Sequence, residues 1–380
     1  MIRINDKAEC CGCTACMNIC PKGAVSIGYN DLDKTIPVID DAKCINCGLC
    51  QSVCPVIQGT EFKEPQMCYA AWTKIDNDKK SCASGGIATA LYRTLMDDGG
   101  AVFGCAFDDD LNLNFRMAES ENDLELFKGS KYVQSCTDFS YKVVKEQLEN
   151  DKKVLYVGSP CQIDGLLHYL RKPYDNLYTV DIICHGVPPI KYLQDYLHGL
   201  FPDKKLENIA FRGERDFELC IDSDNERIYQ KHSYLDLYYH GFLKGMMFRD
   251  NCFKCSYAQK NRVSDITIGD FWELDKSSLE EKYYGNVSVI LTNSTKGEEL
   301  LDMANEKIHF EKRTIAEALK GNDQLNHPFE RPKDRDKYEK NYNKGIAEAL
   351  RSTSIGSDVK LSELKNSKVA MAVKKIIKKV

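Results

Sequence analysis

The stretches CCGCTACMNICP (residues 10–21) and CINCGLCQSVCP (residues 44–55) decide the fold of the N-terminal part of this chain. In each, four cysteines have the spacing C-x2-C-x2-C-x3-C and a proline follows the last one; the first stretch holds one further cysteine, Cys11. A structural zinc site uses four ligands with a long gap between two pairs, and does not place four within eleven residues twice. The doubled spacing therefore indicates iron–sulfur ligation.

This run is that of bacterial ferredoxins with two clusters, in which three close cysteines hold one cubane and the fourth reaches the other. We assign one [4Fe–4S] cluster to Cys10, Cys13, Cys16 and Cys54, and a second to Cys44, Cys47, Cys50 and Cys20. The stretches AVSIG and TIPVID between the motifs alternate apolar and polar residues, which predicts two short paired strands. Cys11 is out of register and is interpreted as a bystander.

Composition limits the classes of protein that this chain can be. Its 380 residues favour two or more folding units, and its net charge of −5 gives no reason to expect a nucleic-acid partner. The start of the chain lacks a signal-peptide pattern, and no apolar run is long enough for stable membrane insertion. A cytoplasmic location is expected, where the 18 cysteines would not form a disulfide framework.

From about residue 65 the pattern changes to alternating strands and helices. The segments AVFGCAF, KVLYV, YTVDII, DITIG and NVSVIL read as strands, so the sequence predicts an α+β chain whose larger α/β domain has a mixed or parallel sheet. Ligands of such sheets bind beyond the carboxyl ends of strands. Cys161, Cys184, Gly269 and Asp270 all lie at predicted strand ends, which points to one shared site.

Four further cysteines suggest a third metal centre. Cys252 and Cys255 have C-x2-C ligand spacing, and Cys161 and Cys184 could complete a tetrahedral sulfur site for a third [4Fe–4S] cluster or for zinc. The alternative is that Cys161 and Cys184 are small core residues, a common place for free cysteine. The remaining cysteines are interpreted as structural: Cys68, Cys82, Cys105, Cys136 and Cys220.

The segment SGG at 84–86 opens a predicted helix, where free backbone N–H groups could hold a phosphate or pyrophosphate. A helix start without a ligand is the competing interpretation. No G-x-G-x-x-G follows a strand, so an ordinary dinucleotide-binding (Rossmann) fold has no support.

Taken together, the motifs resemble the beta subunits of coenzyme F420 hydrogenases and dehydrogenases, placed behind a two-cluster ferredoxin domain. The matching segments appear in family order between residues 68 and 297. They are SCASGGIATAL, GSKYVQS, VGSPCQIDGL, DIICHGVPP, FRDNCFKCSYAQKNRVSDITIGDFWE and GNVSVILTNSTKG.

This resemblance implies a non-covalent FAD held by an α/β fold that is not a Rossmann unit. It places the following residues at or near the flavin: Ser84, Gly85, Gly86, Thr89, Ser130, Lys131, Tyr132, Gln134, Gly269 and Asp270. It also favours the third [4Fe–4S] cluster. His185 is a candidate for protonating a substrate or tuning a cluster, and Lys131 for offsetting charge on a reduced flavin, each against a purely structural role.

The predicted organisation is a ferredoxin-like domain at 1–62, a flavin-binding domain at 63–330 and a charged helical C-terminal appendage at 331–380. The leading hypothesis is an oxidoreductase that passes electrons between a soluble ferredoxin-type carrier and a small organic substrate or deazaflavin. One alternative is an electron-transfer subunit of a larger hydrogenase or dehydrogenase complex, whose catalytic partner is another chain. The chain could also form a homo-oligomer. Another is a flavin-free iron–sulfur sensor or structural protein.

Overall fold

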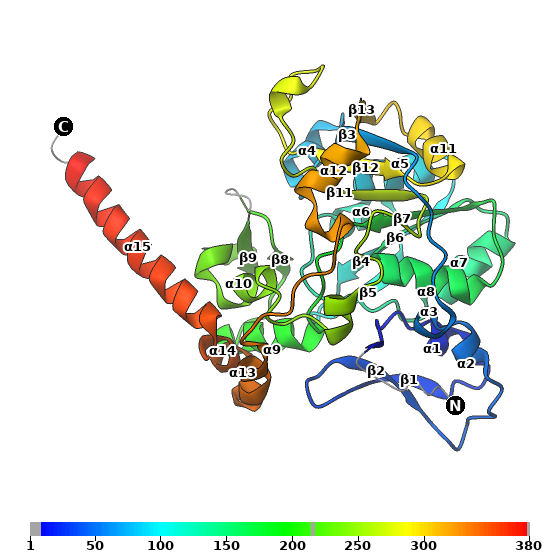
Figure 1. Ribbon diagram of the computed structural model, residues 1–380, viewed down its shortest axis with the longest axis horizontal. Coiled ribbons are helices and arrows are strands. Elements are labelled where there is room, and N and C mark those ends of the chain that lie inside the picture. Colours follow the sequence, from blue (N-terminus) through cyan, green and yellow to red (C-terminus); the bar gives the residue numbers. More distant parts are fainter. Residues whose placement is uncertain (1–8, 214–216, 378–380) are drawn as a thin grey trace.

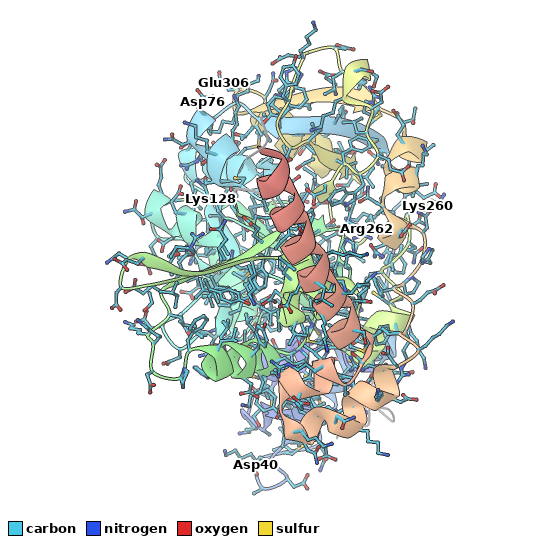
Figure 2. The ribbon with its side chains drawn as sticks, turned by 90° about the vertical axis from the view of Figure 1, so that its left-hand side faces the viewer. Asp40, Asp76, Lys128, Lys260, Arg262 and Glu306 are labelled. Atoms are coloured by element: carbon cyan, nitrogen blue, oxygen red, sulfur yellow. The ribbon has the colours of Figure 1, made fainter. Side chains whose placement is uncertain are left out.

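A computed structural model describes residues 9–213 and 217–377 of the chain, with 367–377 as helix backbone alone. In Figure 1 the N-terminal hairpin (dark blue) lies below the large sheet, and the C-terminal helix α15, Ser354–Ile377 (red), projects away from the rest. Figure 2, turned by 90°, shows the same helix in front of the body. No helix in the described part of the chain is long and apolar enough to cross a membrane.

The N-terminal module consists of two cysteine-rich segments joined by a β-hairpin. Strands β1 (Val25–Tyr29) and β2 (Thr35–Ile39) pair antiparallel, which confirms the two short strands predicted between the motifs. The cysteine segments form only single helical turns, because most of their residues wrap around the cluster positions. These turns are α1 (Ala15–Ile19), α2 (Leu49–Ser52) and α3 (Pro55–Gln58).

The larger domain is built on an eight-stranded sheet in the order β13-β3-β12-β11-β7-β6-β4-β5. Four neighbours at its centre, β11, β7, β6 and β4, run parallel, whereas β12 and β5 pair antiparallel with their neighbours. All five segments predicted as strands are strands. The bounds are β3 Met67–Thr73, β4 Ala101–Phe107, β5 Leu113–Met117, β6 Val154–Gly158, β7 Leu177–Ile182, β11 Ile266–Asp270, β12 Ser288–Thr292 and β13 Ile308–Arg313.

Helices cover both faces of this sheet. Alternation along β3 divides its side chains, since Tyr69 and Ala71 pack with α5 and α11 while Cys68, Ala70 and Trp72 pack with α12 on the other face. Helices α7 and α8 cover the remaining part of that other face. The bounds are α4 Asp76–Ser81, α5 Ile87–Asp97, α6 Glu121–Phe127, α7 Ser140–Glu149, α8 Pro160–Leu170, α11 Thr295–Met303 and α12 Ile315–Gly321.

The N-terminal module shares a core with the large domain. Cys13 and Val53 belong to the same buried cluster as Ile163 and Leu166 of α8. A Cβ atom at Gly165 would lie 2.8 Å from the Cβ of Cys13, so only glycine permits this close approach of α8 to the cysteine segment. The first cysteine motif is therefore packed directly against the helix that begins beside Cys161.

A second core forms around a three-stranded sheet that the sequence did not predict. Its strands, in the order β10-β9-β8, pack with α9, α10 and the C-terminal helices. Tyr338, Ile346 and Leu350 are buried there, so much of the charged segment after residue 330 shares a core with the larger domain. The bounds are β8 Asn208–Ala210, β9 Glu218–Ser223, β10 Glu226–His232, α9 Ile190–Leu200, α10 Leu237–Leu243, α13 Arg335–Asn341 and α14 Ile346–Arg351.

Candidate functional site

The four cysteines predicted for the second N-terminal cluster lie around one small cavity. Cys20, Cys44, Cys47 and Cys50 all line it, together with apolar residues such as Ile39 and Ile45. Cys47 is exposed, and Ile45 is 57% exposed, so this cavity lies at the surface of the module. Cys20 of the first motif thus lies with Cys44, Cys47 and Cys50 of the second, which is the arrangement expected if each motif gives its fourth cysteine to the other cluster.

The other four cysteines of the module are also neighbours, and they lie deeper. The pKa of the Cys16 thiol is raised to about 12 by burial and by the proximity of Cys10 and Cys54. Cys13 is buried against α8. The first cluster position thus faces the large domain, whereas the second faces solvent.

A large cavity of about 470 Å³ lies at the carboxyl ends of β6, β7 and β11. Because these strands are parallel neighbours, their ends meet at one edge of the sheet, as the sequence predicted. Sites for small ligands and cofactors have volumes of about 300–1,000 Å³. The cavity is lined by these residues named from the sequence: Ser84, Gly86, Thr89, Ser130, Lys131, Tyr132, Gln134, Cys161, Cys184, His185, Cys252, Cys255, Gly269 and Asp270.

Three elements bring the four cysteines of the large domain together. Cys161 lies in the first turn of α8, where Ser159 caps the helix and approaches the Cys161 Sγ atom at 3.3 Å. Cys184 follows β7, and the short helix η3 (Asp250–Lys254) carries Cys252, with Cys255 directly behind it. The positive end of the α8 dipole favours negative charge at Cys161.

Burial dominates the electrostatics of these thiols. It raises the pKa of Cys252 to about 12, of Cys255 to about 11, and of Cys184 well above the ordinary value, with neighbouring thiols adding to each shift. A contact with Cys11, and burial, raise the pKa of Cys161 as well. Thiolate ligation here would have to displace bound protons.

In the described residues, no three His, Cys, Asp or Glu side chains converge closely enough to hold a single metal ion. A cubane is wider than one ion, so its four sulfur ligands surround a space and do not meet at a point. Four thiols around one cavity are a donor set of the right chemistry for such a cluster.

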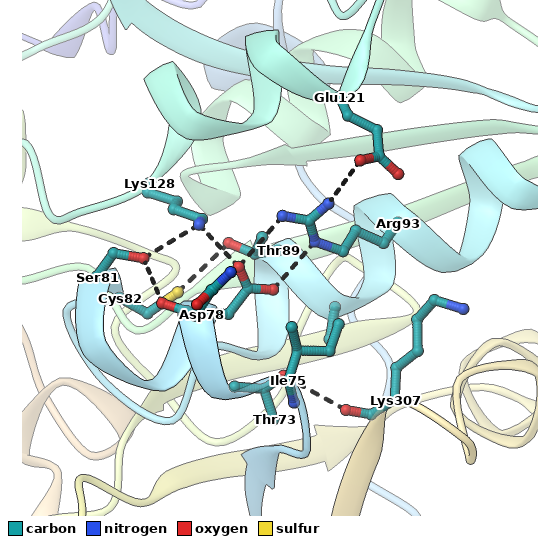
Figure 3. A network of polar contacts seen from close by, with 12 residues as sticks. Thr73, Ile75, Asp78, Ser81, Cys82, Thr89, Arg93, Glu121, Lys128 and Lys307 are labelled. Atoms are coloured by element: carbon teal, nitrogen blue, oxygen red, sulfur yellow. Dashed lines mark hydrogen bonds and ion pairs between the residues drawn. The ribbon is translucent and has the colours of Figure 1, made fainter.

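A buried ion-pair network supports two of the predicted segments, the SGG turn and residues 129–135 (Figure 3). The fully buried Asp78 on α4 accepts from Arg93 of α5 at 3.1 Å and pairs with Lys128 at 2.7 Å. Although burial opposes it, these bonds lower the pKa of Asp78. Cys82 contacts the Thr89 hydroxyl at 3.6 Å across the same turn. The network thereby joins α4, α5 and the segment after α6.

The residues of the SGG turn face two different surroundings: Ser84 and Gly86 line the cavity, and Gly85 bonds to the sheet. Gly86, the residue before α5, lines the cavity, but Gly85 does not. The Gly85 amide donates to the Ser288 hydroxyl at 3.0 Å, and its carbonyl accepts from the Thr73 amide at 2.6 Å. Gly85 therefore anchors the turn to β3 and β12.

Several side chains of the 130–134 segment are engaged by protein groups. The Lys131 ammonium donates to the carbonyls of Phe127 and Lys128 at 3.0 and 2.8 Å, which caps the end of α6, and burial lowers its pKa. The Tyr132 ring stacks on Phe242 with centroids 4.4 Å apart. Gln134 donates to the carbonyl of Cys11 at 3.1 Å.

At the other end of the cavity, Asp270 forms an ion pair with Arg212 at 2.9 Å. His185 is accessible because it faces the cavity, yet the surrounding protein lowers its pKa by desolvation. At neutral pH this imidazole is therefore mainly neutral, and it can donate or accept a hydrogen bond.

The structure also gives positions in this site to residues that the sequence did not single out. Cys11, interpreted as a bystander, lines the large cavity and contacts both Cys13 and Cys161. Cys82 and Cys105, interpreted as structural, line it as well. Arg249 lies between the two cysteine groups. The only sequence signal for it was its position three residues before Cys252.

Comparisons with known proteins agree with this architecture. Residues 9–57 match the 4Fe-4S dicluster domain, and residues 151–318 match the family defined by the C terminus of the coenzyme F420 hydrogenase/dehydrogenase beta subunit. The coenzyme F420-dependent sulfite reductase of Methanocaldococcus jannaschii is 26% identical over 208 residues, which are 53% of this chain and 32% of that protein. The chain thus spans about a third of the length of that relative.

A solved structure of the F420-reducing [NiFe] hydrogenase complex from Methanosarcina barkeri contains a similar chain. The two align with a TM-score of 0.47 and 18% identity, over 79% of this chain and 92% of that one. This chain thus combines a segment that matches the 4Fe-4S dicluster domain, at residues 9–57, with a segment that matches the C terminus of the coenzyme F420 hydrogenase/dehydrogenase beta subunit, at residues 151–318.

Proposed function

We propose that this protein is an iron–sulfur flavoprotein oxidoreductase that passes electrons between a ferredoxin-type carrier and an organic substrate or deazaflavin. The observation that carries the proposal is the single cavity of about 470 Å³, which the four cysteines share with most of the residues expected at FAD. One-electron and two-electron chemistry would meet there, since a bound flavin supplies the conversion between the two.

The arrangement of the cysteine groups supports an order for the electron carriers. The second cluster position is exposed at Cys47 and suits contact with an external carrier. The first lies against α8, and Cys11 joins it to Cys161 at the large cavity. Electrons would pass from the surface to the cavity through these positions, or in reverse, because nothing in the arrangement fixes a direction.

The chain's own residues provide the remaining requirements of such a site. The helix start at Gly86 and the amides beside it would hold phosphate groups of FAD. Asp78, Arg93 and Lys128 keep that turn and the 129–135 segment in place. Neutral His185 and the Arg212–Asp270 pair line the other end, where they would orient an organic substrate.

The first test is the content of iron, sulfide and flavin per chain after strictly anaerobic purification. About twelve irons with one FAD would support three cubanes beside a flavin. About eight irons with FAD would keep the oxidoreductase and remove the third cluster. Eight irons without flavin, even after reconstitution with FAD, would refute the proposal and leave a flavin-free iron–sulfur protein.

A second candidate function is that of an electron-transfer subunit. It is favoured by one observation, that the matching segment is only about a third of the curated relative, so that the rest of that protein lies outside the match. Affinity purification of the tagged chain from its own cells, followed by mass determination of the eluted complex, distinguishes the two. A stoichiometric partner chain would favour the subunit, whereas a lone flavin-loaded chain that reduces a deazaflavin would favour the enzyme.

A further inference from the structure

Arg249 is a buried cation between the first cysteine group of the N-terminal module and the cysteines of the large cavity. Its side chain is almost fully buried, with the residue 3% exposed. The guanidinium donates to the carbonyls of Cys10 and Thr35, each at 2.7 Å, and to the Gln134 amide oxygen at 2.9 Å. All of these acceptors are neutral.

The same residue also holds a cysteine of the large domain. The Cys252 amide donates to the Arg249 carbonyl at 3.0 Å, and the Arg249 amide donates to the Val187 carbonyl at 3.1 Å. Arg249 therefore contacts the first cysteine group through its side chain and the C-x2-C loop through its backbone.

Among the described residues, no carboxylate lies within ion-pair distance of Arg249. Its neighbour Asp250 is engaged elsewhere, since it pairs with Lys34 of the hairpin at 2.6 Å. The other almost fully buried arginines nearby do have acidic partners, Asp181 for Arg262 and Glu339 for Arg335. A buried charge without a counter-charge is strongly unfavourable in a folded protein.

The missing counter-charge is supplied by the chemistry of the cysteine groups themselves. A cubane held by four thiolates carries net negative charge, and Arg249 lies next to ligands of two such groups. We propose that Arg249 is a positioning residue that neutralises the first N-terminal cluster and the third cluster together, and that fixes the spacing between them. Of the proposed function, this inference depends only on the presence of the third cluster.

A positive charge at this position stabilises the reduced, more negative form of both clusters, so it raises their reduction potentials. Removing it should make both clusters harder to reduce. The exposed second cluster, whose cysteines Arg249 does not contact, should be least affected. A residue with a merely structural role would not produce this selective change.

The test is an anaerobic redox titration, followed by electron paramagnetic resonance, of the full-length, cluster-loaded protein. In Arg249→Met, with iron content unchanged, we expect the potentials of two of the three clusters to shift in the negative direction. Arg249→Lys, which keeps the charge, should show less than half of that shift. The control Lys34→Met/Asp250→Asn removes a neighbouring contact without changing net charge, and should leave the potentials unchanged.

Unchanged potentials in a fully loaded Arg249→Met protein would overturn the proposal. If that variant does not retain its iron, Arg249→Gln, which keeps a hydrogen-bond donor for the Cys10 carbonyl, takes its place, and the same criterion applies. The outcome is separable from the proposed function, because cluster potentials can be measured without flavin. A protein with only eight irons would refute the third-cluster part while leaving the effect on the first cluster measurable.

Discussion

The guanidinium of Arg262 donates to Asp181 Oδ1 at 2.9 Å, and the two side chains are 1% and 0% exposed. Arg262 follows the C-x2-C loop, and Asp181 lies near the carboxyl end of β7, just before Cys184. Arg262 also donates to the Tyr257 carbonyl at 2.8 Å. The pair thereby holds the loop with Cys252 and Cys255 against the strand that carries Cys184.

Breaking this pair should destabilise the protein strongly. Either Arg262→Met or Asp181→Asn leaves a buried group without its partner, which costs about 3–5 kcal/mol. Chemical denaturation of the loaded protein measures this loss. Lys260→Met is the matched control, because Lys260 pairs with Glu64 on the surface at 3.3 Å and should change stability by less than about 1 kcal/mol (Figure 2). If Lys260→Met lost as much unfolding free energy as Arg262→Met or Asp181→Asn, this account would be contradicted.

Substitution of the C-x2-C cysteines should remove one cluster and spare the others. We expect Cys255→Ser to lower the iron content from about twelve to about eight per chain, with flavin retained. Cys68→Ala is the control, since Cys68 is buried in a different apolar cluster on β3 and should keep full iron content. Iron analysis and flavin absorbance measure both outcomes. Full iron in Cys255→Ser would exclude Cys255 as a ligand.

The turn before α5 should not tolerate a side chain at Gly86. This glycine has φ +79°, and a Cβ atom there would lie 2.7 Å from Thr73 Cγ2. Gly86→Ala should therefore displace the turn and lower FAD affinity at least tenfold. Gly99, just beyond the end of the same helix, also has a positive φ (+76°) but open space around it. Gly99→Ala has the same backbone strain and should keep normal FAD affinity in a fluorescence titration. Equal loss of affinity in both variants would remove the turn from the site.

The pair of His168 and Asp164, both on α8, should stabilise the fold less as the pH rises. The hydrogen bond to Asp164, at 3.0 Å, raises the pKa of His168 above its ordinary value, and Asp164 also binds Thr60 and Tyr257. Because the folded-state pKa is raised, the stabilisation is complete below the unfolded pKa of about 6.5 and is lost as pH rises through the folded value.

For this partly exposed pair the effect should be at most about 1 kcal/mol. Unfolding free energies of the wild type and His168→Gln, compared at pH values below 6 and above 8, measure it. The difference between the two proteins should be largest at the lower pH. A difference that grows with pH would contradict the assignment.

The predictions from sequence succeeded where the signal was local. Strand segments such as AVFGCAF and DITIG are apolar and short, and the structure has strands at both. The three-stranded sheet was missed because strands such as ERIYQKH are mainly polar and lack the alternation of a half-buried strand. The Asp224–Asn225 turn before it, with positive φ at both residues, is the hairpin signal that could have revealed it. The C-terminal segment was read as an appendage because of its charge. However, its apolar residues Tyr338, Ile346 and Leu350 pack into a distant part of the chain.

By itself, the sequence predicts which cysteines of the N-terminal module ligate the two clusters, because cubane ligation depends on cysteine spacing within a few residues. It also determined that Cys161, Cys184 and Asp270 lie at strand ends, because strand length and apolar pattern are local properties. The sequence also predicts one shared site at those ends, but only the tertiary structure decided its form, because the parallel pairing of β6, β7 and β11 sets how the ends surround a cavity of about 470 Å³. The tertiary structure alone placed Cys11 against Cys161 and Arg249 against Cys10, because such contacts depend on how α8 and the C-x2-C loop pack on a module more than 100 residues away in the chain.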